Sequence, residues 1–186
     1  MSKVFRIYVK KREEFAVEAK EVLENLRVQL KLDNLRNLSI INRYDVEGVS
    51  EEVLKTGINT ILSEPMVDDV YMEEYPSVGN TFAIEFLPGQ YDQRADACEQ
   101  CFSILTGAND VKVKCAKLFD VVGEDLDLDK IQKFLINPVD QRLASLDKPL
   151  SLKDGEVDIP LVPIISGFIN FSDEELREYI LSLIHI

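Results

Sequence analysis

Apolar blocks in the first half of the chain recur in the same order in the second half, and this recurrence restricts the fold more than any other feature of the sequence. The first block alternates as a strand does: Phe5, Ile7 and Val9 match Phe82, Ile84 and Phe86. The second ends in glycine: Leu38, Ile40, Tyr44, Val46 and Gly48 match Val113, Cys115, Phe119, Val121 and Gly123. The third ends in proline: Ile58, Ile61, Leu62 and Pro65 match Ile131, Phe134, Leu135 and Pro138.

The segments between these blocks have helical periodicity. Apolar residues from Phe15 to Leu30 recur every three or four positions, which predicts one buried helix face. Ser50 can cap a second helix, which ends before Pro65. In the first strand, Arg6, Tyr8 and Lys10 are expected on a wetter face.

We therefore predict an α/β (α+β) fold that contains two copies of a β-α-β-α-β unit, at residues 3–75 and 80–142. Each copy is expected to pack its helices on one face of a small sheet, and the two sheets are expected to face one another as a pseudo-dimer. The alternative is that two unrelated α/β segments share an alternation pattern that is common in such proteins.

The most specific stretch runs from Leu87 to Asp96. Pro88 and Gly89 favour a turn, and Asp92 can accept hydrogen bonds from the free N–H groups of a helix that begins after it. A helix start uses only one or two acceptors and no guanidinium, so the stretch carries surplus polar groups. These are predicted to form an interdomain interface: Gln90, Tyr91, Asp92, Gln93, Arg94 and Asp96.

Three segments, at residues 41–48, 88–96 and 135–140, resemble the N-terminal domain of the large form of phosphoribosylformylglycinamidine synthase (FGAM synthase, PurL family). That domain is similar to a fused dimer of the small PurS subunit, which would account for the duplication. The resemblance covers residues 3–147.

The resemblance implies a part in de novo purine biosynthesis, in a ligase that uses ATP and glutamine to convert formylglycinamide ribonucleotide into formylglycinamidine ribonucleotide. Within it, this chain would be a non-catalytic scaffold that docks against the synthetase and glutaminase domains of the same enzyme. ATP and Mg²⁺ would be cofactors of the full-length enzyme, with none bound in this fragment. The alternative is a free-standing ferredoxin-like regulatory module that binds a small effector between its two units.

No catalytic, cofactor-binding or metal residues are predicted. Cys98 and Cys101 form one Cys-x-x-Cys pair without further zinc ligands, so both are expected to pack as thiols beside Phe102 and Leu105. His185 is the only histidine. The acidic run at 124–129 lacks the pattern of a calcium loop and is expected to stabilise a helix N-terminus. No glycine-rich phosphate loop occurs, so the isolated chain is expected to be inactive.

The chain is predicted to divide into a duplicated domain at 1–147, a linker at 148–165 and the truncated start of a linker domain at 166–186. Ser172 and Glu175 predict a capping box. The last six residues, Leu181 to Ile186, resemble the in-frame translation of a transposon-derived sequencing adapter; a natural apolar tail is the alternative.

A net charge of −13 disfavours nucleic acid and anionic membranes as partners, because both carry negative charge. The three cysteines are an odd number in a chain of 186 residues, large enough to need no disulfides, which indicates reduced thiols. The N-terminus has no signal-peptide pattern. We therefore expect a cytoplasmic protein.

Overall fold

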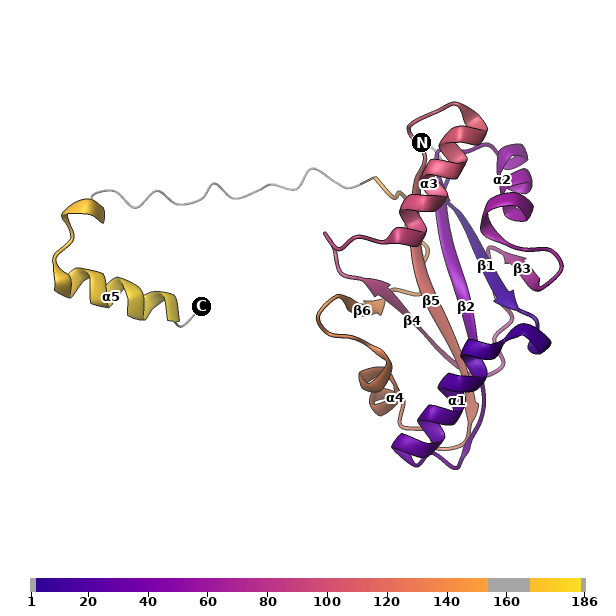
Figure 1. Ribbon diagram of the computed structural model, residues 1–186, viewed down its shortest axis with the longest axis horizontal. Helices are drawn as coiled ribbons and strands as arrows, with labels where there is room; N and C mark the ends of the chain where they lie inside the picture. The colour runs from indigo at the N-terminus through magenta and orange to yellow at the C-terminus, as the bar shows by residue number, and fades with distance from the viewer. Residues whose placement is uncertain (1–2, 154–167, 185–186) are drawn as a thin grey trace. The chain divides into compact units, whose positions relative to one another are not determined.

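A computed structural model describes residues 3–153 and 168–184, and the chain divides into two compact units, one ending at Lys153 and one beginning at Asp154. The first unit holds six strands and four α-helices, with a 3₁₀ turn and a π-helical turn (Figure 1). In chain order these are β1 (Phe5–Lys11), η1 (Glu13–Phe15), α1 (Val17–Leu30), β2 (Leu35–Glu47), α2 (Glu51–Gly57), η2 (Ile58–Leu62), β3 (Asp68–Met72), β4 (Asn80–Phe86), α3 (Gln93–Thr106), β5 (Lys112–Gly123), α4 (Leu128–Leu135) and β6 (Gln141–Ala144).

The strands form one antiparallel sheet in the order β3-β1-β2-β5-β4-β6. The prediction of two sheets that face one another is therefore wrong, although the mixed α/β class is confirmed. The long central strands β2 and β5 pair along their length, from Leu35 opposite Gly123 to Glu47 opposite Lys112. This pairing satisfies N–H and C=O groups that would otherwise lie at two open sheet edges.

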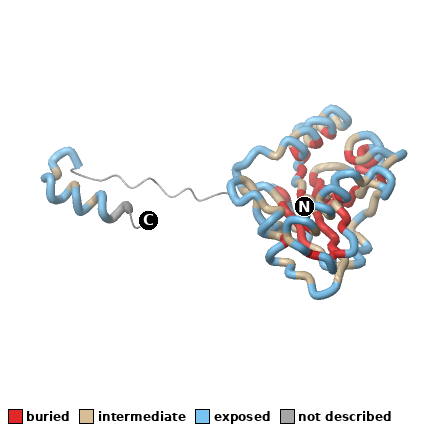
Figure 2. Tube along the Cα trace, turned by 60° about the horizontal axis from the view of Figure 1, so that its bottom comes forward, coloured by how far each residue is buried: buried red, intermediate tan, exposed pale blue. Residues whose placement is uncertain are grey.

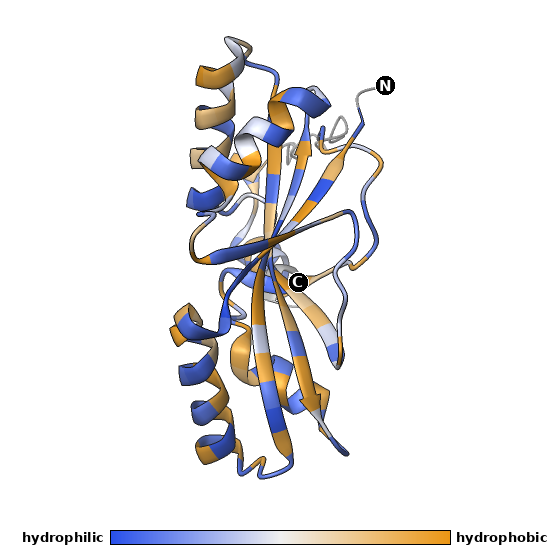
Figure 3. Cartoon of the chain, turned by 90° about the vertical axis from the view of Figure 1, so that its right-hand side faces the viewer, coloured by the Kyte–Doolittle hydropathy of each residue, from blue (hydrophilic) through white to orange (hydrophobic). Residues whose placement is uncertain are grey.

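The helices lie on one side of the sheet, and loop segments lie on the other (Figure 3). Two apolar clusters fill the space between helices and sheet, and each cluster combines elements from both halves of the chain. In the first, α2, η2 and α3 cover β1 together with parts of β2 and β5. In the second, α1 and α4 cover β4 together with the remaining parts of β2 and β5. The buried residues concentrate between these layers (Figure 2).

The sheet face opposite the helices is not the wetter face that the sequence predicts. Arg6 and Tyr8 are only 2% and 8% exposed. Residues 145–152, which we call the strap, cover part of this face, and Leu152 of the strap is itself buried. Residues 148–153, where a linker is predicted to begin, thus belong to the first compact unit.

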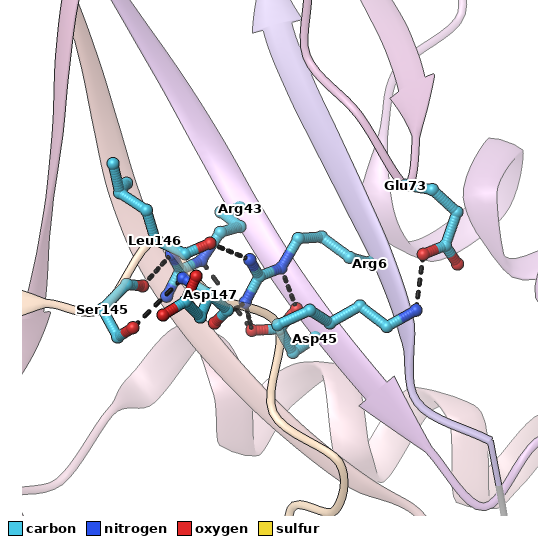
Figure 4. A network of polar contacts seen from close by, with 8 residues as sticks. Arg6, Arg43, Asp45, Glu73, Ser145, Leu146 and Asp147 are labelled. Carbon is cyan, nitrogen blue, oxygen red and sulfur yellow. Dashed lines mark hydrogen bonds and ion pairs between the residues drawn. The ribbon is translucent and has the colours of Figure 1, made fainter.

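A buried charge network holds the strap against the sheet (Figure 4). Arg6 donates two hydrogen bonds to the carboxylate of Asp45, from Nε at 2.6 Å and from Nη2 at 2.8 Å. Its Nη1 donates to the carbonyl oxygen of Leu146 at 2.6 Å, and Arg43 donates to the carbonyl oxygen of Ser145 at 2.7 Å. The two guanidinium groups thereby satisfy carbonyls of the strap, which explains how charged residues are accommodated in the interior.

Most helix starts follow the local chemistry of the sequence. Ser50 Oγ accepts from the N–H of Val53 at 3.3 Å, and Asp127 accepts from the N–H of Lys130 at 3.0 Å, so the expected Ser50 cap and the expected role of the acidic run are confirmed. Phe15 is an exception, because it lies in η1 before the helix and is 46% exposed instead of joining the buried face.

The second unit consists, in its described part, of η3 (Phe168–Asn170) and α5 (Asp173–Ile184). The predicted capping box is present: Glu175 accepts from the N–H of Ser172 at 2.8 Å, and Ser172 Oγ accepts from the N–H of Glu175 at 3.4 Å. Residues 181–184 continue α5. Residues 154–165 of the predicted linker and His185 and Ile186 of the tail lie outside the described residues.

Burial of Tyr44 and Cys98 predicts that the fold weakens in alkali. Burial raises the pKa of Tyr44 to about 12 and that of Cys98 to about 11. Both groups bind their protons more tightly when folded, so their contribution is complete below about pH 8.5 and is lost as pH rises towards 12. Each group should lower the free energy of unfolding by up to about 1.4 kcal/mol per pH unit in that window.

Urea unfolding at pH 8, 9.5 and 10.5 measures this decline. The Tyr44→Phe variant is the matched control, because it keeps the ring and removes the titrating hydroxyl, and its free energy of unfolding should fall less steeply above pH 10. A wild-type curve that stays flat to pH 10.5 would contradict the expectation.

Candidate functional site

A groove of about 780 Å³ opens on the helix-covered side of the sheet. Its floor includes Asn42 of β2 and Lys117 of β5, which lie opposite one another at the centre of the sheet. Its walls include Glu18 of α1 and Arg94 of α3. The groove therefore brings together both halves of the chain.

The structure places four of the six predicted interface residues in the lining of this groove, namely Tyr91, Asp92, Gln93 and Arg94. A tight turn positions them, because the N–H of Gln90 donates to the carbonyl of Leu87 at 3.0 Å. Gly89 has φ of +85°, a conformation that favours glycine. Gln90 and Asp96 flank the lining residues in sequence without lining the groove themselves, and whether the six form an interdomain interface stays a prediction.

Two of these residues stabilise the start of α3. Asp92 Oδ1 accepts hydrogen bonds from the N–H groups of Arg94 at 3.0 Å and Ala95 at 3.1 Å, which confirms it as the helix cap. Asp96 accepts a hydrogen bond from the Tyr91 hydroxyl at 2.8 Å, and this bond raises the pKa of Tyr91. Asp92, Asp96 and Tyr91 therefore already have partners within the helix start.

Arg94 is bound differently. Its Nη1 donates to the hydroxyl of Tyr44 at 3.1 Å, and among the described residues it has no carboxylate partner. Of the other charged groups in the groove, Lys117 pairs with Glu18 at 2.6 Å and Glu85 pairs with Arg142 at 2.7 Å, whereas the carboxylate of Asp92 accepts hydrogen bonds from backbone N–H groups. Of the two cations in the groove lining, Arg94 is therefore the one without an ion pair among the described residues.

Sequence reasoning did not single out Asn42 or Lys117 as site residues. Each interrupts an apolar strand face, Asn42 between Ile40 and Tyr44, and Lys117 between two apolar neighbours of β5. A polar side chain in the middle of an otherwise buried strand face is a signal that could have found them. Asn42 is half-buried, and its side-chain amide takes part in no hydrogen bond with another described residue.

The thiols are arranged differently from the prediction. Cys98 and Phe102 are buried, but Cys101 and Leu105 are exposed, because α3 buries only the stripe through Ala95, Cys98 and Phe102. Cys115 lines the groove, and burial raises the pKa of its thiol, so the sulfur stays protonated at neutral pH and is a weak nucleophile. Across residues 3–153 and 168–184, no group of three or more His, Cys, Asp or Glu is placed to share a metal ion.

Comparison of the chain with protein-family models, with curated proteins and with solved structures finds no match. In the described part of the chain, no helix combines the length and the apolar character that crossing a bilayer requires.

Proposed function

We propose that this chain is a non-catalytic scaffold made of two PurS-like units, and that it serves phosphoribosylformylglycinamidine synthase by docking the synthetase and glutaminase domains. The observation that carries the proposal is the strand order, which reads the same outward from the β2–β5 pair in both directions: β2, β1, β3 on one side and β5, β4, β6 on the other. A two-fold relation between two copies requires that the central pair be antiparallel, as it is.

The register supports the same duplication. Val9 of β1 lies between Asn42 and Val70, and Ile84 of β4 lies between Lys117 and Leu143. Ile84 follows Val9 by 75 residues, and Lys117 follows Asn42 by 75 residues. Leu143 follows Val70 by 73 residues. The residues matched in the second sequence block are also 75 residues apart, and those matched in the third block are 73 residues apart.

For the first block, the register changes the match by two residues. Strand pairing relates Val9 to Ile84, whereas the sequence blocks relate Ile7 to Ile84. The reason is that alternation has a period of two, so a shift of two residues leaves the pattern of buried and exposed positions unchanged. The pattern identifies the strand but does not fix its register.

The experiment that tests the proposal begins with the gene. Sequencing the source DNA past the codon of residue 180 should reveal a synthetase core in frame, and the enzyme it encodes should form formylglycinamidine ribonucleotide from ATP and glutamine. A stop codon directly after Ile186 would overturn the proposal. Loss or retention of Leu181 to Ile186 in that sequence also decides between an adapter and a natural tail.

In that full-length enzyme, Arg94→Ala should lower glutamine-dependent turnover by about tenfold and ammonia-dependent turnover by less than about twofold, because a loosened interface misplaces the two active sites relative to one another. The measurement compares glutamine with ammonium chloride as the nitrogen source. Arg36→Ala is the matched control, because Arg36 is exposed, pairs with Glu124 and lies outside the groove lining. Equal losses with both nitrogen sources would show that Arg94 does not couple the domains.

A regulatory module that binds a small effector is the second candidate function, and the groove favours it. The cavity lies between the two halves of the chain, it is large enough for a small molecule, and its lining mixes apolar and charged residues. The same DNA sequence distinguishes the candidates, because a free-standing module needs no synthetase core.

A further inference from the structure

Among the described residues, the guanidinium of Arg94 has no carboxylate partner, although the chain has a large excess of negative charge. The chain carries 34 acidic and 21 basic residues, so carboxylates outnumber cations. Arg94 instead donates one hydrogen bond to a neutral phenol, since burial holds the pKa of Tyr44 at about 12. A guanidinium has five donors in a planar fork, so Arg94 keeps donors available to an anion.

The position of Arg94 in its helix is a second reason to expect an anion beside it. Arg94 is the second residue of α3, which spans Gln93–Thr106. The N-terminal end of a helix carries partial positive charge, so a cation in the first turn is electrostatically unfavourable. Asp92 offsets part of that charge, but its hydrogen bonds go to backbone N–H groups and not to the guanidinium. An anion in the groove would stabilise both the helix end and Arg94.

The remainder of the groove is suited to an apolar body. Val22, Ile40, Phe119 and Leu135 contribute to its lining, and they come from α1, β2, β5 and α4. The floor also offers the side-chain amide of Asn42, which has no hydrogen-bond partner within the described part of the chain. A ligand could thus bury apolar surface while one end reaches the cation.

The acidic lining residues limit the charge of such a ligand. Glu18, Glu85 and Asp92 also line the groove, and the chain as a whole carries a net charge of −13. These charges repel a polyanion more strongly than a monoanion. A single carboxylate on an apolar body is the chemistry that satisfies Arg94 with the least repulsion.

We propose that this groove is a binding site for a small organic monocarboxylate with an apolar body, whose carboxylate pairs with Arg94. The site does not depend on the docking role, and it names the class of effector that the second candidate function would bind. It also differs from a surface for an acidic protein segment, because the apolar body of the ligand, and not a peptide backbone, packs against Val22, Ile40, Phe119 and Leu135.

The test uses the full chain and 3-phenylpropanoate as a probe, followed by ¹H–¹⁵N NMR. Titration should shift the amide signals of Asn42, Arg94, Cys115 and Lys117, saturably and together. The neutral analogue 3-phenyl-1-propanol should bind at least about tenfold more weakly, because it cannot form the charge-assisted pair. Inorganic phosphate, which has charge and no apolar body, should also bind at least about tenfold more weakly than the acid.

Arg94→Gln should lower the affinity for 3-phenylpropanoate by at least about tenfold and leave the affinity for the alcohol unchanged. The reason is that glutamine removes the charge and keeps most of the side-chain length. Arg36→Gln is the matched control and should change neither affinity. Unchanged chemical-shift dispersion in both variants shows that they are folded. Equal affinities for acid and alcohol, shifts confined to other surfaces, or no saturable shift with the acid would each overturn the proposal.

Discussion

Neither residues 1–79 nor residues 80–153 should fold as a monomer when each is produced alone. The reason is that each apolar cluster draws side chains from both halves of the chain. Around Phe5 and Leu54, the first cluster includes Phe102 and Val113 from the second half. Around Phe82 and Ile131, the second cluster includes residues of α1 and β2 from the first half.

The size of the effect follows from burial. The second half supplies Cys98, Phe102, Val111 and Val113 to the first cluster, and burying a large apolar side chain contributes about 1.5–3 kcal/mol. Losing this group removes several kilocalories per mole from a domain whose total stability is about 5–15 kcal/mol. Separation also exposes β2 along the edge that pairs with β5.

Circular dichroism and ¹H–¹⁵N NMR of each fragment measure the outcome, and sedimentation separates monomers from self-associated fragments. Mixing the two fragments should restore the spectrum of the intact domain. Residues 1–153 are the matched control, because they form one compact unit and should fold fully without the C-terminal unit. A cooperatively folded monomer of either half would refute the idea of a shared core.

Asp45→Ala should lower the free energy of unfolding by about 3–5 kcal/mol, because it leaves a buried guanidinium without its counter-charge. Asp45 and Arg6 are 3% and 2% exposed and form two hydrogen bonds with each other. Arg43 lies close to the same carboxylate, with 3.8 Å between its Nε and Asp45 Oδ2. The substitution therefore affects two buried cations at once.

Urea unfolding measures the loss, and Arg36→Ala is the control for an exposed ion pair, expected to change stability by less than about 1 kcal/mol. In the double variant Arg6→Met with Asp45→Leu, part of the stability should return, because apolar side chains replace the buried Arg6–Asp45 pair, while Arg43 keeps its hydrogen bond to the carbonyl oxygen of Ser145 but loses its counter-charge. A loss below 1 kcal/mol for Asp45→Ala would mean that water reaches the network in solution.

Features set by neighbouring residues could be predicted from the sequence. The strands around Ile7 and Ile40 and the caps at Ser50 and Asp92 follow from side-chain period and from the hydrogen-bonding capacity of single residues. The pairing of β2 with β5 could not be predicted in this way. Alternation shows which face of a strand is buried, but it does not show which strand lies beside it in the sheet.

Only part of the candidate site could be predicted, because the sequence shows residues together only when they are neighbours in the chain. Tyr91 to Arg94 form a continuous motif, so the sequence shows them together. Lys117 and Asn42 meet them only because β2 and β5 pair at the centre of the sheet. The burial of Arg6 depends on a strap more than 130 residues away, since its hydrogen bonds reach Leu146 and Asp147 over separations of 140 and 141 residues.

The strap also sets the order in which a ribosome can complete the domain. The first strands leave the ribosome long before residues 145–152, and until then Arg6 has Asp45 but lacks its two carbonyl acceptors. Contacts over such long separations in sequence form late, because the chain between them must first be ordered. The part of the sheet face under the strap therefore stays open to solvent and to chaperones during synthesis, until the strap arrives and Ser151 and Leu152 donate to Glu47.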